Sequence, residues 1–190
     1  MHRENSPVPK KSVNINIFDF DETLFRVPGI ACKEAASMTP YEWYDSPGSL
    51  NLELNPRAIL NTVSAAKNYL DKRYLVTHRV EACKKAVNEL LLKNKIEFDG
   101  EYFLGRETRK GDTVWEILQE NREIKTVRIY EDSLWEIIQY VKTFIEKDPE
   151  VTFKYKIEFS FIDKTKVIEL DWEAAFTIAQ TAKFEKLKII

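Results

Sequence analysis

Acidic residues at the end of an apolar run are the first feature of this sequence that could carry out chemistry. The segment IFDFDETLF (17–25) places Asp19 and Asp21 two residues apart, with Thr23 two residues further on. Side chains two residues apart point the same way while a strand lasts, so both carboxylates could act on one substrate. A carboxylate can attack phosphorus and form an acyl-phosphate, provided that a divalent cation brings the two anions together.

Three later segments supply further polar side chains, each where an apolar run ends or a helical pattern begins. They are Thr77 in LVTHR, Lys110 before a helical pattern, and the pair Glu131-Asp132 after the run VRIY. Phosphoryl transfer would use Thr77 and Lys110 to hold the transferring group and to offset its charge. Asp132 would complete a site of hard oxygen ligands, which suits Mg²⁺.

The two carboxylates of the first run would have different roles. Asp19 would be the nucleophile and a metal ligand, while Asp21 would protonate the leaving oxygen and later activate water. Lys110 has nearby competitors in Arg106 and Arg109, and we choose Lys110 because it directly precedes the predicted helix.

These residues need a scaffold, and the spacing of apolar residues predicts alternating strands and helices. Strands are predicted at 13–18, 74–77, 102–104 and 127–130. Helical stripes are predicted between and after them: Ile59, Leu60, Val63, Ala66 and Leu70; Val80, Cys83, Val87, Leu90 and Leu91; Val114, Ile117 and Leu118; and Leu134, Ile137, Ile138, Val141, Phe144 and Ile145. This alternation predicts an α/β fold with a mainly parallel sheet covered on both faces, which binds ligands at the carboxyl ends of its strands.

The end of the chain departs from that alternation. Residues 152–163 and 166–170 flank Lys164-Thr165 and predict an antiparallel hairpin. A last helix is predicted from about Trp172, with Ala175, Phe176 and Ala179 pointing inward.

Residues 26–55 form an irregular stretch that is long for a connection without structure of its own, so we expect an active-site insert. It contains Tyr41, Trp43 and Tyr44. Stacking of these rings on a nucleobase is one interpretation, and anchoring of the insert against the core is the one we favour.

Basic residues also follow Thr77, namely Arg79, Lys84 and Lys85. They could attract a substrate phosphate, but an ordinary solvated helix face is the interpretation we favour. Cys83 lies on the apolar stripe and is predicted to be part of the core.

Length and composition limit the remaining possibilities. With 190 residues and 22.3 kDa, the chain predicts one domain over 13–190 behind a polar tail at 1–12. A net charge of −2 gives no general attraction to nucleic acid or membrane, and two cysteines suit a reducing cytoplasm. No two of the five glycines have the two-residue spacing of a dinucleotide fingerprint, and we expect neither a secretion signal nor a membrane span.

Together, the order hhhhDxDxT, hhhT, Lys before a helix, and hhYED resembles the haloacid dehalogenase (HAD) superfamily of phosphatases. DFDETLF matches its first motif almost letter for letter, and the four motifs span residues 13–132. TLFRVP, WYDSPGSL, LVTHR and IYED are similar to the "Swiss Army Knife" branch, which is associated with RNA repair. The resemblance implies a three-layer Rossmann-like sheet, Mg²⁺ dependence and an aspartyl-phosphate intermediate.

The resemblance also implies site residues. They are Asp19 as nucleophile, Asp21 as acid and base, and Thr77 and Lys110 as phosphoryl-binding groups. The metal set is Asp19, Asp132 and the backbone carbonyl of Asp21, and the superfamily pattern favours Asp132 over Glu131.

Three departures weaken the substrate assignment. His78 replaces a glycine usual in that branch, Ser133 replaces an arginine, and the Thr-rich, Phe-Lys pattern expected near residue 113 is only partly present as TRKGDTVW. The insert at 26–55 is small for a full cap domain, so the site would be open to bulky substrates. We therefore expect a phosphorylated substrate such as a nucleotide or an RNA 3′-phosphate end, recognised without an extended nucleic-acid groove. The alternatives are a catalytically weak phosphate-binding module on the same fold and a phosphotransferase with an acceptor other than water.

Overall fold

The computed structural model describes six segments of the chain, and the structural statements below concern these residues alone: 13–27, 37–50, 57–68, 70–121, 123–163 and 166–187. The predicted tail at 1–12 lies outside them. So do residues 28–36 and 51–56, which include part of the predicted insert, and the predicted turn at Lys164-Thr165.

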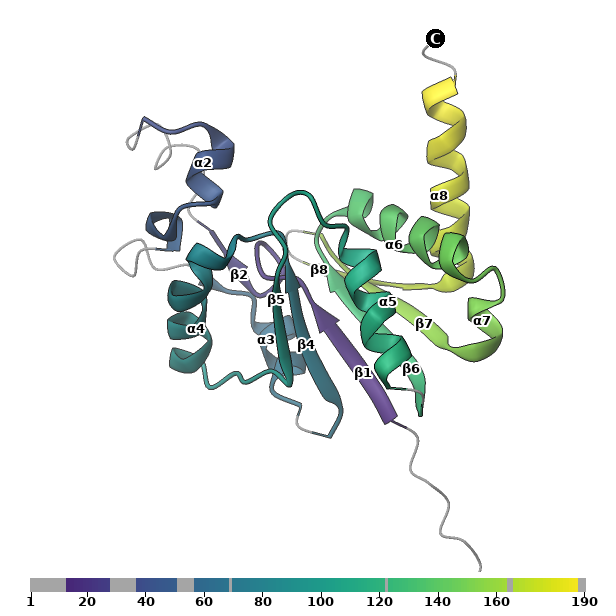
Figure 1. Ribbon diagram of the computed structural model, residues 1–190, viewed down its shortest axis with the longest axis horizontal. Helices are drawn as coiled ribbons and strands as arrows, with labels where there is room; N and C mark the ends of the chain where they lie inside the picture. The colour runs from purple at the N-terminus through teal and green to yellow at the C-terminus, as the bar shows by residue number, and fades with distance from the viewer. Residues whose placement is uncertain are drawn as a thin grey trace, which may run out of the picture.

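A six-stranded sheet forms the centre of the described structure, in the order β5-β4-β1-β6-β7-β8 (Figure 1). Its strands are β1 (Val13–Phe18), β4 (Lys72–Thr77), β5 (Gly100–Phe103), β6 (Ile124–Glu131), β7 (Lys156–Asp163) and β8 (Lys166–Asp171). The first five in this order run parallel, and β8 pairs antiparallel with β7. The predicted mainly parallel sheet and its terminal hairpin are thus confirmed.

Helices cover both faces of this sheet, which gives the molecule three layers (Figure 1). One face carries α5 (Lys110–Glu120), α6 (Leu134–Lys147) and α8 (Trp172–Leu187), and the other carries α3 (Leu60–Ala66) and α4 (Lys84–Lys93). Alternate residues of β1 serve the two cores: Ile15 and Ile17 pack under α5 and α6, and Phe18 packs on the opposite side. The fold is α/β and Rossmann-like, as predicted.

Several element boundaries differ from the prediction. Residues 151–154 form the short helix α7 (Val151–Lys154), so the hairpin begins at Lys156. β6 begins at Ile124, three residues before the predicted strand. A 3-10 turn, η2 (Glu81–Cys83), precedes α4, and Cys83 is buried as predicted.

Four predicted core residues are exposed. The prediction was wrong for Leu60, Leu70, Leu134 and Phe176, which are 76, 83, 39 and 36% exposed. Leu70 lies beyond the end of α3, and Leu60 and Leu134 are the first residues of their helices. Phe176 directly follows the buried Ala175 on α8. Successive side chains of a helix point about 100° apart, so Phe176 points toward solvent.

The described part of the insert consists mainly of short helical elements. It contains the helix α2 (Pro40–Tyr44), closed by a capping box between Thr39 and Glu42, and the 3-10 turn η1 (Pro47–Leu50). A small ladder pairs β2 (Phe25–Arg26) with β3 (Arg57–Ala58) in antiparallel fashion.

The topology selects one edge of the sheet for a ligand. From β1 the chain adds β4 and β5 on one side, and α5 then leads to β6 and β7 on the other side of β1. The strand order reverses beside β1, and ligands of open α/β sheets bind outside the carboxyl ends of the strands at such a switch point. No described helix is both long enough and apolar enough to span a membrane.

Candidate active site

Three carboxylates meet at the carboxyl ends of β1 and β6. Asp19 directly follows β1, where its backbone N–H donates to the carbonyl of Tyr130 at 3.1 Å. Glu131 ends β6 and Asp132 follows it. One oxygen from each of Asp19, Glu131 and Asp132 lies within 4.8 Å of the others; the first two side chains are buried and Asp132 is half-buried.

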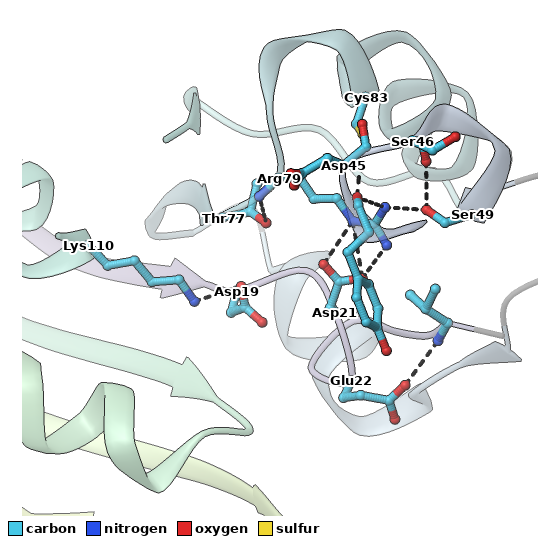
Figure 2. Close-up of polar contacts among 12 residues, drawn as sticks. Asp19, Asp21, Glu22, Asp45, Ser46, Ser49, Thr77, Arg79, Cys83 and Lys110 are labelled. Carbon is cyan, nitrogen blue, oxygen red and sulfur yellow. Dashed lines mark hydrogen bonds and ion pairs between the residues drawn. The ribbon is translucent and has the colours of Figure 1, made fainter. Parts of the chain in front are cut away.

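Lys110 supplies the cation at this cluster. It is the first residue of α5 and is 3% exposed. Its Nζ donates to Asp19 Oδ1 at 2.8 Å (Figure 2) and to Glu131 Oε2 at the same distance. Burial lowers the pKa of its ammonium, but the charges of Asp19 and Glu131 outweigh this and hold that pKa well above its ordinary value. Lys110 is therefore a permanent cation beside Asp19.

Three carboxyl groups share the single ammonium of Lys110 in this described cluster. Burial raises the pKa of Glu131 well above its ordinary value, although Lys110 opposes this. Burial, followed by the charge of Asp19, raises the pKa of Asp132 to about 7. A cation among these oxygens would relieve that repulsion, and an all-oxygen donor set is the kind that Mg²⁺ takes. The residues present therefore fit a hard divalent metal ion.

The side chain of Asp21 lies outside this triad and pairs with Arg79. The guanidinium donates from Nε to Oδ2 at 2.9 Å and from Nη2 to Oδ1 at 2.6 Å, which makes a two-pronged contact (Figure 2). Burial raises the pKa of Asp21, and the bond from Arg79 offsets part of that rise. Arg79 thus fixes the orientation of Asp21.

The remaining donors of Arg79 connect the insert to the end of β4. Nη1 donates to the backbone carbonyl of Tyr44 at 2.6 Å and to Ser49 Oγ, and the backbone N–H donates to Thr77 Oγ1 at 3.1 Å. The Arg79 residue is 2% exposed. The predicted solvated helix face was therefore wrong for Arg79, because Asp21 and the insert enclose this side chain.

Thr77 is fully buried as the last residue of β4, the strand next to β1. The structure thus brings Asp19, Lys110 and Asp132 to one point and sets Thr77, Asp21 and Arg79 beside it at the same edge. The competitors of Lys110 lie elsewhere: Arg106 pairs with Asp45 at 2.6 Å, and Arg109 pairs with Asp112 and Glu146.

His78 joins three elements at this edge. Its Nδ1 lies 2.7 Å from the carbonyl oxygen of Gly105, and its Nε2 lies 3.4 Å from Glu136 Oε1 on α6. Gly105 has φ +63°, a conformation that suits glycine. The bond with Glu136 raises the pKa of His78, against the effect of burial.

The aromatic residues of the insert have different surroundings. Trp43 is buried, as expected of an anchor, whereas Tyr41 and Tyr44 are 66 and 40% exposed. The guanidinium of Arg106 lies 4.1 Å from the centre of the Tyr41 ring, and that of Arg79 lies 5.5 Å from the Tyr44 ring. Burial thus agrees with anchoring for Trp43 and not for Tyr41 or Tyr44.

Sequence reasoning did not assign roles to Arg79 and Glu131. The spacing of Arg79 from Thr77 was visible, but its burial depends on residues 30 to 58 positions away, such as Ser49 and Asp21. Glu131 was considered only as a competitor of Asp132, and in the structure both carboxylates belong to the cluster.

Comparisons with known proteins give the following matches. No family model matches the chain, and no curated protein matches it. A chain from a solved Pnkp1/Rnl/Hen1 complex is 17% identical with a TM-score of 0.46, over 71% of this chain and 42% of that chain. A chain from a solved Pnkp1/Rnl/Hen1 RNA repair complex is 14% identical with a TM-score of 0.44, over 75% of this chain and 42% of that chain. This chain spans less than half the length of either.

Proposed function

We propose that this protein is a Mg²⁺-dependent phosphatase of the HAD type, which hydrolyses a phosphomonoester through an aspartyl-phosphate on Asp19. The observation that carries the proposal is the contact of Asp19 with the Lys110 ammonium at 2.8 Å, inside a cluster with two further carboxylates. A nucleophile of this kind needs a positive field, because the attacking carboxylate and the phosphate are both anions.

In the first half of the reaction, a carboxylate oxygen of Asp19 forms a bond to phosphorus as the bond to the leaving oxygen breaks. Asp21, held by Arg79, donates a proton to that leaving oxygen. Lys110 offsets the charge on the transferring phosphoryl group, and Thr77 at the end of β4 helps to hold that group.

In the second half, Asp21 as a carboxylate takes a proton from water, and the water oxygen attacks phosphorus. The bond from phosphorus to Asp19 breaks, which releases phosphate and restores the Asp19 carboxylate. Asp19, Glu131 and Asp132 would hold Mg²⁺, with the backbone carbonyl of Asp21 as a further candidate ligand. When bound, the ion would supply positive charge to the phosphoryl oxygens.

The described part of the insert supports our choice of substrate class. The described part of the insert is a short helix and a turn, so we propose an open site for a nucleotide or an RNA 3′-phosphate end rather than a small metabolite. Initial rates on RNA 3′-phosphate ends, free nucleotides and sugar phosphates at matched concentration test this choice. Faster turnover of the sugar phosphates would contradict it.

Release of inorganic phosphate from an aryl phosphate tests the reaction class. We expect Mg²⁺-dependent turnover by the wild type and a loss of at least about 10³-fold in Asp19→Asn, which keeps the shape but not the nucleophile. Asp171→Asn is the matched control, because Asp171 caps α8 through Ala174 N–H and asparagine caps as well. Equal rates for Asp19→Asn and wild type would refute the proposal.

A further inference from the structure

A basic cavity of about 280 Å³ lies between the β2–β3 pair and the start of β8. Three cationic side chains and an apolar floor line it: Arg26, Arg57 and Lys166, with Ile59, Ile162 and Val167. None of its nine lining residues is acidic. Lys166 also pairs with Asp163, which is not among the lining residues, with Nζ 4.0 Å from Oδ2.

Two of the three cations face each other across a ladder. Arg26 and Arg57 are directly opposite in the antiparallel pairing of β2 with β3, so their side chains lie on the same face. Like charges in this arrangement destabilise a ladder, and both side chains line the cavity. An anion in the cavity would lie within reach of both guanidinium groups.

The cavity and the active site share one edge of the sheet. β2 begins four residues after Asp21, and Ile59 N–H donates to the carbonyl of Leu24 in the intervening loop at 2.8 Å. On the other side, Glu131 is in register with Phe161, and the next residue of β7 is Ile162. Two strand spacings, roughly 10 Å, separate β1 from β7 in the hydrogen-bonding direction.

We propose that this cavity binds the phosphodiester backbone of a single-stranded nucleic acid whose terminal phosphate lies at Asp19. This inference rests on the proposed function and deepens it. A single strand carries one phosphate charge per nucleotide, so phosphates behind the terminal one can reach a neighbouring site, whereas a sugar monophosphate has no second phosphate. The cations pair with the phosphates, and the apolar floor contacts a sugar or base.

The net charge of −2 agrees with recognition of only one or two phosphates of a strand. With no general attraction to a polyanion, affinity for a strand must come from local cations. The cavity places three of them at the active-site edge, enough for one or two phosphates inside the end of a strand.

The test compares substrates of two lengths with a double charge reversal, Arg57→Glu/Lys166→Glu. For a 3′-phosphorylated RNA tetranucleotide we expect KM to rise at least tenfold with kcat nearly unchanged, and the salt slope of log kcat/KM to fall by about one or two. For a nucleoside 3′-monophosphate and an aryl phosphate, kcat/KM should stay within about twofold. Lys125→Glu/Lys142→Glu makes the same change in net charge away from the cavity, and should leave the tetranucleotide KM unchanged.

A binding measurement separates failure of the cavity from failure of the phosphatase. Anisotropy of the labelled tetranucleotide is followed in the Asp19→Asn background, where no turnover is required. A tenfold loss of affinity from the cavity reversal alone supports the proposal. Equal affinity of the cavity variant and the control variant for the tetranucleotide overturns it. So does a cavity variant that loses as much affinity for the nucleoside 3′-monophosphate as for the tetranucleotide. Absence of aryl phosphate turnover would instead refute the proposed function, whatever the affinity.

Discussion

At the scale of single residues, the site consists of two neighbouring ion pairs with different tasks. Lys110 contacts the proposed nucleophile Asp19, and Arg79 contacts the proposed acid and base Asp21. A buried charge that loses its partner is costly, so removal of either member of a pair should destabilise the fold. The two aspartates are therefore held apart in separate environments, although they are two residues apart in the chain.

The two-pronged contact of Arg79 predicts that lysine cannot replace it. Arg79→Lys keeps the charge but loses the planar pair of donors and the bond to Ser49, so we expect a loss of about 2 kcal/mol in the free energy of unfolding. Urea denaturation measures this loss. Arg109→Lys is the matched control, since Arg109 is exposed, and it should change stability by less than about 0.5 kcal/mol. Equal stability of the two variants would contradict the structural role of Arg79.

The pair of His78 with Glu136 predicts a pH-dependent contribution to stability. The pKa of His78 is raised above 6.5, so its contribution is complete below about pH 6.5 and is lost as pH rises through the folded-state pKa. The pKa of Glu136 is lowered below 4.5, because the bond from His78 outweighs burial, so its contribution is lost as pH falls through that lower value. The pair therefore stabilises most between about pH 5 and 6.

The variant His78→Gln should lose about 0.5 kcal/mol at pH 5.5 and almost nothing at pH 9, since both side chains are partly exposed. Urea unfolding at the two pH values measures the difference. A loss that is equal at both values, or larger at pH 9, would show that the ion pair does not act as described.

At the scale of elements, α5 and α6 approach each other closely next to Lys110, the first residue of α5. Gly111 follows Lys110, and a Cβ at Gly111 would lie 2.8 Å from both Cβ and Oγ1 of Thr143 on α6. Only glycine allows this contact without a shift of one helix. The position of Lys110 beside Asp19 thus depends on glycine at position 111, the next residue.

The substitution Gly111→Ala should therefore destabilise the protein. Alanine favours a helix by about 1 kcal/mol, but we expect the clash with Thr143 to reverse this to a net loss of about 1–3 kcal/mol. Gly48→Ala is the control, because its Cβ would meet only Ser46 Oγ, at 3.2 Å. Thermal unfolding of both variants is the measurement, and a Gly111→Ala protein as stable as wild type would contradict the packing argument.

The elements also show what the sequence could predict. Apolar runs located the strands, because a buried parallel strand must be apolar on both faces, and Asp19, Lys110 and Asp132 followed from their places at strand and helix ends. The exposed side of α3 at Leu60 and the helix in the insert could not be predicted in this way. They depend on where a short helix ends and on contacts such as Arg106 with Asp45, 61 residues apart.

At the scale of the whole molecule, a small net charge conceals two opposite local fields. The carboxylates of Asp19, Glu131 and Asp132 gather at the ends of β1 and β6, and the cations of the basic cavity gather between β2 and β8. A substrate with a metal-bound phosphate at one end and a charged backbone behind it complements both fields.

A metal ion that binds this acidic cluster only in the folded protein should stabilise the whole fold. At ten times its Kd, Mg²⁺ should add about 1.4 kcal/mol to the free energy of unfolding, and removal by a chelator should reverse this. Urea unfolding with and without Mg²⁺ measures the effect. The variant Glu131→Gln/Asp132→Asn should lose the response, whereas Asp171→Asn should keep it. Equal stabilisation by Mg²⁺ of the wild type and both variants would mean that the metal binds elsewhere.

The central claim is the covalent phosphoryl group on Asp19, and mass spectrometry of acid-quenched protein tests it most directly. Asp21→Asn keeps an acceptor for Arg79 but cannot activate water, so an aryl phosphate with a good leaving group should leave the intermediate trapped. We expect the mass of one phosphoryl group on the peptide that contains Asp19, located at that residue and absent from Asp19→Asn/Asp21→Asn. A phosphoryl group on another residue, or none while the wild type turns over the same substrate, would contradict the account.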